Sequence, residues 1–155
     1  MEQVSVRKLL SQHPFFERMA PEQLDLISGC AQNKSFNEGE YLCKEATPAN
    51  EFFLIRHGIV SLEVHCPGKG DLVLETIGPN EILGWSWIVP PYEWLYNAKA
   101  KENVRVTSLD GRCLRNKCDE DPRLGYELMK RFSVILANRL KSTRLRLKDL
   151  YGGQI

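Results

Sequence analysis

Long apolar runs are absent from this chain of 155 residues. No stretch approaches the roughly 18 consecutive apolar residues that can cross a bilayer. The N-terminus carries Glu2, Arg7 and Lys8 with only two adjacent leucines, which does not resemble a signal peptide. We therefore expect a cytoplasmic protein with no membrane partner.

An excess of charge of either sign is also lacking. The chain holds 21 Lys and Arg against 20 Asp and Glu, a formal net charge of +1. This balance gives the whole molecule no electrostatic attraction to nucleic acid or to an anionic membrane. Binding to such a partner would need a local cluster of basic residues. The length fits a single domain, residues 1–155.

Cysteines are few and follow no spacing pattern. There are five, an odd number, and no Cys-x-x-Cys pair occurs among them: Cys30, Cys43, Cys66, Cys113 and Cys118. Scattered cysteines of this kind predict neither a disulfide framework nor a zinc site. We expect most of them to be small buried hydrophobic residues.

Residues for catalysis or metal binding are scarce as well. A metal site on a β-roll needs two or three histidines with a carboxylate, but only His57 and His65 fall in the strand region and His13 lies near the N-terminus. No serine or cysteine stands in a nucleophile-elbow context. We expect no enzyme, no metal and no cofactor, with haem ligation by a Cys or His as a minor alternative.

Turn residues are plentiful, and they divide the middle of the chain into short runs. Residues 4–10 and a segment that begins at Pro21 have helical patterns; the second places four residues at helical spacing, Leu24, Ile27, Cys30 and Ala31. From Asn33 onward, turn signals recur roughly every 8 to 12 residues, which predicts a sandwich, roll or barrel. The predicted strands are 34–36, 41–43, 51–56, 59–65, 72–77, 97–100 and 104–109.

The last part of the chain is helical. A short helix is predicted at 114–118, and Asp121 with Pro122 is typical of the start of a second one. No strong helix breaker follows before Gly152, so this helix is predicted to have about 28 residues and a length of about 40 Å.

Apolar or small residues recur along this long helix in steps of four and three, which is a heptad pattern: Leu136, Leu140, Thr143, Leu147 and Leu150. The helix can lie on its own β-core or pair with a second copy. We favour the pair, because Leu128, Phe132 and Ile135 can face the core first. The basic flanks of the helix are interpreted as a solvated face, with a nucleic-acid surface as the less favoured alternative.

The segment from Gly84 to Tyr96 holds all three tryptophans beside the pair Pro90 and Pro91. Two prolines forbid a continuous helix and block strand pairing, so we expect a shaped loop with one helical turn at its start. Leaving so many rings in water would be costly. The rings therefore either fill a core or line a pocket, and the sequence leaves both alternatives open.

This order of elements resembles the cyclic-nucleotide-binding domain of the catabolite activator type over essentially the whole chain. The resemblance is carried by His13 to Phe16 with Leu24, the turn 36–40, the stretch 44–55, Gly58 with Val60, and Pro122 with Leu140. It implies an α+β fold, an eight-stranded antiparallel β-roll of the jelly-roll kind with a long C-terminal dimerisation helix. The implied ranges are 1–32 for N-terminal helices, 33–110 for the roll, 82–96 for a cassette loop and 112–151 for the hinge and long helix.

In that family the cassette loop binds the cyclic phosphate. A Gly-Glu pair opens it, and an arginine near its end grips the phosphate through a forked hydrogen bond. Gly84 matches the glycine, but Trp85 and Ser86 follow in place of the acid, and the arginine's position falls on Trp94 or Leu95. Without a cation beside it, the desolvation cost of a buried phosphate would not be offset, and binding would be weaker by several kcal/mol.

The resemblance also implies candidate ligand contacts. One is the hydroxyl of Thr143 on the long helix, which aligns with a hydroxyl that contacts the nucleotide base in the family. These candidates are Gly84, Trp85, Ser86, Trp87, Trp94, Leu95, Tyr96 and Thr143. A surviving pocket would suit a flat or apolar molecule.

We accordingly expect a non-catalytic regulatory or sensor domain with a degenerate phosphate cassette. It would form a homodimer and bind an unusual small ligand or act through a protein partner. The alternatives are a conventional receptor for cyclic AMP or cyclic GMP, and a structural dimer module with a filled pocket. DNA is not an expected partner, because the chain stops at Ile155 and transcription factors of this type carry a helix-turn-helix module after the long helix.

Overall fold

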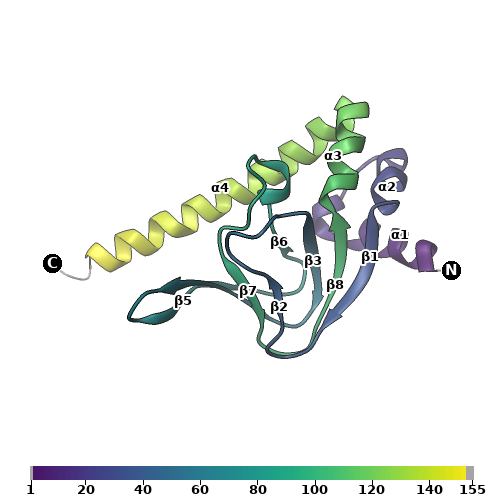
Figure 1. Cartoon of the computed structure of the whole chain (residues 1–155). Helices are drawn as coiled ribbons and strands as arrows, with labels where there is room; N and C mark the ends of the chain where they lie inside the picture. Colours follow the sequence, from purple (N-terminus) through teal and green to yellow (C-terminus); the bar gives the residue numbers. More distant parts are fainter. Residues whose placement is uncertain (1, 153–155) are drawn as a thin grey trace. The chain divides into compact units, whose positions relative to one another are not determined.

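The computed structural model describes residues 2–152. The chain forms two compact units, Met1–Lys117 and Cys118–Ile155, and each is described here by itself. Over residues 2–117, the first unit contains three N-terminal helical segments and eight strands. Figure 1 shows how the chain runs through them. The second unit contains the end of a short helix and the whole of a long one. The predicted domain boundaries stay a prediction.

The N-terminal segments are α1 (Glu2–Gln12), the 3₁₀ helix η1 (Pro14–Phe16) and α2 (Pro21–Ser28). Pro21 opens α2 as predicted, but the helix stops before Gly29. The expectation that Cys30 and Ala31 continue it was wrong, because Ala31 begins a strand and pairs with Leu109. The helical spacing of Cys30 and Ala31 did not decide their structure, because pairing with the distant strand β8 places Ala31 in a sheet.

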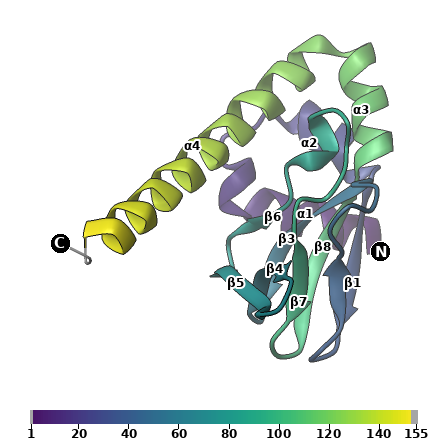
Figure 2. The ribbon, with the colours of Figure 1, turned by 60° about the vertical axis from the view of Figure 1, so that its left-hand side comes forward.

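Eight strands form two four-stranded sheets. Their bounds are β1 (Ala31–Phe36), β2 (Tyr41–Cys43), β3 (Glu51–His57), β4 (Val60–Cys66), β5 (Gly70–Ile77), β6 (Ile82–Leu83), β7 (Asn97–Ala100) and β8 (Val104–Asp110). The strand orders are β1-β8-β3-β6 and β2-β7-β4-β5, and every pair is antiparallel. The predicted eight-stranded antiparallel roll is confirmed, and β1, β8 and β3 lie side by side in Figure 2. The two-residue β6 was not among the runs predicted from turn spacing.

The core lies between the sheets, where alternate residues of the strands meet. Phe53 and Ile55 of β3 and Val60 of β4 are completely buried there, together with Val106 of β8. Successive side chains of a strand point to opposite faces, so Phe52 lies on the outer face of β3. Phe52 is also fully buried. Strand β3 is therefore covered on both sides, which explains its unbroken apolar run.

Two helices follow the roll. Helix α3 (Gly111–Glu120) begins after Asp110, whose carboxylate accepts a hydrogen bond from the Cys113 amide at 3.0 Å. Helix α4 (Pro122–Gly152) has 31 residues and starts where the Asp-Pro pair predicted it. The Asp121 carboxylate caps it by accepting from the amides of Arg123 and Leu124. None of the helices over residues 2–152 is both long and apolar enough to span a bilayer.

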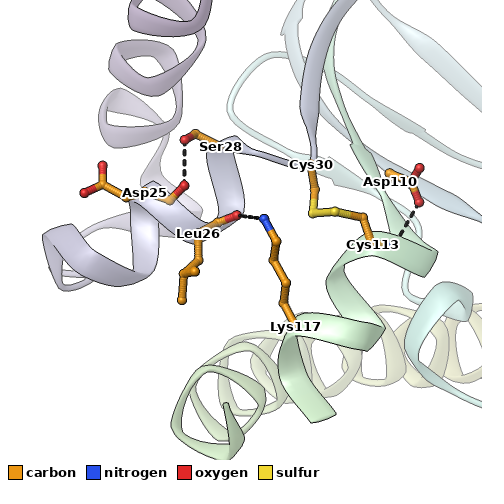
Figure 3. Close-up of a disulfide and its surroundings, with 7 residues drawn as sticks. All are labelled: Asp25, Leu26, Ser28, Cys30, Asp110, Cys113 and Lys117. Carbon is orange, nitrogen blue, oxygen red and sulfur yellow. Dashed lines mark hydrogen bonds between the residues drawn. A yellow bond between two sulfur atoms is a disulfide. The ribbon is translucent and has the colours of Figure 1, made fainter. Parts of the chain in front are cut away.

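The prediction that the cysteines form no disulfide was wrong. Cys30 and Cys113 are bonded, with their Cα atoms 5.8 Å apart and a separation of 83 in sequence (Figure 3). Two cysteines this far apart in sequence cannot be recognised as a pair from the spacing of neighbouring cysteines. Of the others, Cys43 is buried, and its burial raises the pKa of its thiol, while Cys66 and Cys118 are half-buried.

Candidate functional site: the aromatic loop and its arginine

The aromatic loop connects β6 to β7 and begins with the predicted single helical turn, the 3₁₀ helix η2 (Ser86–Ile88). Backbone hydrogen bonds fix its second half against the segment before β3. The Trp94 amide donates to Thr47 and its carbonyl accepts from Ala46, and the Tyr92 carbonyl accepts from Ala49. The second half of the loop is therefore hydrogen-bonded to the roll and is not a free flap.

Trp94 lies inside the roll. Only 4% of it is exposed, its ring stacks on Phe53 with centroids 6.4 Å apart, and it also contacts Tyr96. Gly84 has a φ of +104°, and a Cβ added there would come within 2.7 Å of the Trp94 ring. The glycine that opens the cassette is thus required both by its left-handed backbone and by the indole that occupies the space next to it.

Trp87 occupies the other side of β3. It is completely buried and stacks on Phe52 at a centroid distance of 5.0 Å. Because Phe52 and Phe53 point to opposite faces, Trp87 and Trp94 hold the loop against both sides of the same strand. Two of the three tryptophans are packing residues, which favours the filled-core alternative over an open aromatic pocket.

The remaining predicted residues of the loop are arranged differently. Ser86 is buried and Trp85 is half-buried, whereas Leu95 is 55% exposed. Of the two positions that align with the family's arginine, Trp94 therefore points into the roll and Leu95 points to solvent. No arginine occurs between Gly84 and Ala100.

Lys99, the lysine nearest to the loop in sequence, does not replace the missing arginine. Its neighbours Ala98 and Ala100 both belong to the inner core, so strand alternation turns Lys99 to the opposite face of β7. There its ammonium nitrogen lies 5.8 Å from the centroid of the Tyr41 ring.

Arg115 of α3 is the guanidinium that contacts the loop, and the sequence analysis did not foresee it. Its Nη1 donates to the Trp87 carbonyl, and its Nη2 lies 3.5 Å from Oδ1 of Asn50. The guanidinium carbon is also 4.3 Å from the centroid of the Tyr92 ring, a cation–π geometry. Nothing local marks this residue, because its three partners come from segments 23 to 65 positions earlier. Arg115 therefore joins α3 to the loop, at the Trp87 carbonyl and the Tyr92 ring.

The predicted residues of the long helix lie in the second unit. Thr143 is exposed, as are the heptad leucines Leu140, Leu147 and Leu150, at 72%, 50% and 63%. Leu136 is half-buried. The proposed contact of Thr143 with a ligand stays a prediction.

Side chains suited to metals do not gather in the described residues. Over residues 2–152 no three His, Cys, Asp or Glu side chains lie close enough together to hold a metal ion. His57 and His65 are both exposed, and His65 pairs with Asp71 at 3.3 Å.

The roll, its cassette loop and the helices that follow define a known class. A family model described as "Cyclic nucleotide-binding domain" matches residues 33–121, and the chain belongs to that family. It is a domain of the regulatory or sensor kind.

Individual relatives are more distant. The chain is similar to the CRP-like cAMP-activated global transcriptional regulator of Mycobacterium tuberculosis, with 24% identity over 143 residues. That match covers 92% of this chain but only 62% of the regulator's own length. Human cGMP-dependent protein kinase 2 is 25% identical over 146 residues, which cover 93% of this chain and 18% of the kinase.

Solved structures share the fold. A putative cyclic nucleotide-binding protein from Geobacter metallireducens has a TM-score of 0.77 at 27% identity, over 90% of this chain and 98% of that protein. The regulatory domain of Toxoplasma gondii PKA, crystallised with cAMP, has a TM-score of 0.73 at 12% identity, over 88% of this chain and 50% of that one. The second likeness concerns the fold alone.

Proposed function

We propose that this chain is a non-catalytic regulatory module whose cassette does not bind the phosphate of a cyclic nucleotide. In its place, the module's own aromatic side chains complete the core, and it acts through a partner protein or a second copy of itself. The observation that carries this proposal is the position of Trp94, stacked on Phe53 and in contact distance of Gly84.

The charges near the loop support the same proposal. A cyclic phosphate in a partly desolvated site needs a cation with hydrogen bonds, and a guanidinium is best suited to supply both. The position that faces inward carries Trp94 instead. Arg115 already uses its donors on the Trp87 carbonyl and on Asn50.

The route by which the module signals follows from Arg115. It joins the loop to α3, and α3 leads through Asp121 into the long helix α4. A change in the loop's conformation would alter the contacts of α3 and so pass along the chain to α4. Such a two-state change is what a partner protein would recognise.

A second candidate is a sensor for a flat, apolar ligand. Trp85 is half-buried and so leaves part of an indole accessible in the cassette. A ligand that stacked on rings would not need the missing acid and arginine. In this candidate the tyrosine hydroxyls and Ser86 would orient the ligand.

Calorimetric titration with cyclic AMP and cyclic GMP tests the proposal. We expect no binding heat at ligand concentrations up to about 1 mM, corresponding to an affinity weaker than about −4 kcal/mol. The Toxoplasma PKA regulatory domain, which was crystallised with cAMP, serves as the positive control under the same conditions. Micromolar binding of either nucleotide would reject the proposal and establish the conventional receptor.

Native mass spectrometry separates the first candidate from the second. A mass equal to that of the polypeptide, or twice it, supports the partner-driven module with a filled core. A copurified small molecule that leaves on denaturation supports the ligand sensor. The Trp85→Ala variant should lose such a molecule, whereas Glu93→Ala, at an exposed position of the same loop that is not among the candidate contacts, should keep it.

A further inference from the structure

The Cys30–Cys113 disulfide crosses from the residue that precedes β1 to the first turn of α3, just beyond the end of the β1–β8 ladder, where Ala31 pairs with Leu109. Cys30 lies between the end of α2 and the start of β1, and Cys113 lies in the first turn of α3 (Figure 3). The bond therefore links the start of α3 covalently to the short segment between α2 and β1.

Few other interactions described in the first unit make the same connection. The Lys117 ammonium donates to the Leu26 carbonyl at 2.6 Å, and the Asp110 amide donates to the Cys30 carbonyl at 2.8 Å. The lysine bond is exposed to solvent, where such bonds contribute little. Beyond Asp110, the described links from α3 to α2 and to Cys30 are therefore the covalent bond and this exposed hydrogen bond.

The disulfide is reachable from solvent. A hollow with a volume of about 320 Å³ opens beside it, and both half-cystines belong to its wall. Cys30 is buried, whereas Cys113 is half-exposed. The wall also carries Lys34 and Glu51, whose side chains pair at 3.0 Å, and Ser108, which donates to Glu51. A small polar thiol can therefore enter the hollow without crossing an apolar surface.

We propose that Cys30 and Cys113 form a thiol–disulfide exchange site that controls how firmly α3 is held, with small dithiols as its reductants. A dithiol enters the hollow as a thiolate and attacks Sγ of Cys113, the half-cystine whose residue is the more exposed of the two. The S–S bond breaks, Cys30 leaves as a thiolate and takes up a proton. The second thiol of the reductant then attacks the mixed disulfide and releases Cys113.

The exchange balances in atoms and electrons. The reductant is oxidised to its cyclic disulfide and gives two electrons and two protons, which appear as the thiols of Cys30 and Cys113. The N-terminal position of Cys113 on α3 favours its release, because a helix N-terminus stabilises a thiolate. Disulfides in reducing compartments are commonly of this transient, redox-sensing kind. The inference does not depend on which ligand the cassette binds.

Counting thiols tests whether the site exists. Protein purified without reductant and then denatured should react with a thiol reagent at three cysteines, namely Cys43, Cys66 and Cys118. After treatment with dithiothreitol and its removal under anaerobic conditions, all five should react. Five reactive thiols before treatment would overturn the proposal.

Hydrogen exchange tests whether the bond controls α3. Reduction of the wild-type protein should speed exchange at the amides of residues 114–117 by about tenfold or more, and leave the β3 and β8 amides unchanged. Oxidised dithiothreitol should restore the slow exchange. The double variant C30S/C113S should resemble the reduced protein without any reagent, while C66S, which changes a cysteine outside the bond, should respond to reduction as the wild type does.

Two results would overturn the controlling role. Unchanged exchange at 114–117 on reduction would mean that the disulfide is structural only, and exchange that rises equally in β3 and β8 would mean global unfolding. Because reduction acts on the wild-type chain, the test stands even where C30S/C113S fails to fold. A negative result in these redox tests would not change the outcome of the titrations with cyclic AMP and cyclic GMP, which test the proposed function separately.

Discussion

His13 combines two roles that make it sensitive to acid. Its side chain is buried, and its Nδ1 accepts a hydrogen bond from the Phe15 amide at 3.2 Å, which caps η1. Burial lowers the pKa of His13 to about 4, against a smaller opposing effect of the Glu81 backbone. The ring is therefore neutral in the folded protein, and its protonation would both charge a buried group and remove the acceptor.

The pH dependence of stability follows from this shift. An unfolded histidine has a pKa of about 6.5, so between that pH and about 4 the unfolded chain binds more protons and the folded state loses stability as the pH falls. We expect urea midpoints to drop between pH 7 and pH 4.5 in the wild type. The His13→Asn variant retains a capping acceptor that does not titrate, so its drop should be smaller. Equal drops in the two proteins would contradict the assignment.

At the level of elements, the described side-chain hydrogen bonds from α3 to the loop come from one residue. Arg115 contacts the Trp87 carbonyl, the Asn50 side chain and the Tyr92 ring at once. A lysine cannot reproduce this arrangement, because it lacks the planar fork that binds and stacks simultaneously.

Replacing Arg115 should loosen the loop without unfolding the roll. We expect Arg115→Ala to cost about 1.5 to 2 kcal/mol of stability, the lower part of the range for charged hydrogen bonds, since the residue is only half-buried. Hydrogen exchange should rise in residues 86–92 but not in β3. Arg115→Lys should recover part of the loss, and Arg112→Ala, at an exposed position of the same helix, should change neither quantity. An Arg115→Ala protein with an unaltered loop would show that the contact carries no restraint.

At the level of the whole molecule, the long helix presents an exposed heptad face. Leu140, Leu147 and Leu150 are each at least half-exposed on α4. A row of leucines at heptad spacing is what a parallel pair of helices buries. The homodimer predicted from the sequence stays a prediction, and this exposed row is the feature that supports it.

The dimer can be tested by adding charge to this row. The double variant Leu140→Lys and Leu147→Lys should behave as a monomer in light scattering, because two lysines on each helix would face their copies across the contact. The variant Ser142→Lys and Leu145→Lys adds the same charge outside the heptad row and should keep the dimer mass. The heptad assignment fails where the first variant keeps the mass of the wild type, or where both variants lose it.

Local signals were sufficient for most elements of the fold. Pro21 and the Asp121–Pro122 pair placed two helix starts correctly, since a proline fits the first turn and an aspartate caps it. Tyr41–Cys43 and Asn97–Ala100 coincide with β2 and β7 because turn residues bound both runs. The two-residue β6 and the end of α2 were missed, since both depend on pairing with distant strands.

The sequence by itself determined the family, the roll and the absence of an arginine from the cassette, because composition and the spacing of turns are properties of neighbouring residues. Tertiary structure alone decided three other points: that Trp94 points into the core while Leu95 does not, that Arg115 reaches the loop, and that Cys30 meets Cys113. Each of these joins residues through space rather than along the chain. The energy of such a contact depends on the packing of the whole roll, so it cannot be predicted from the residues next to it in sequence.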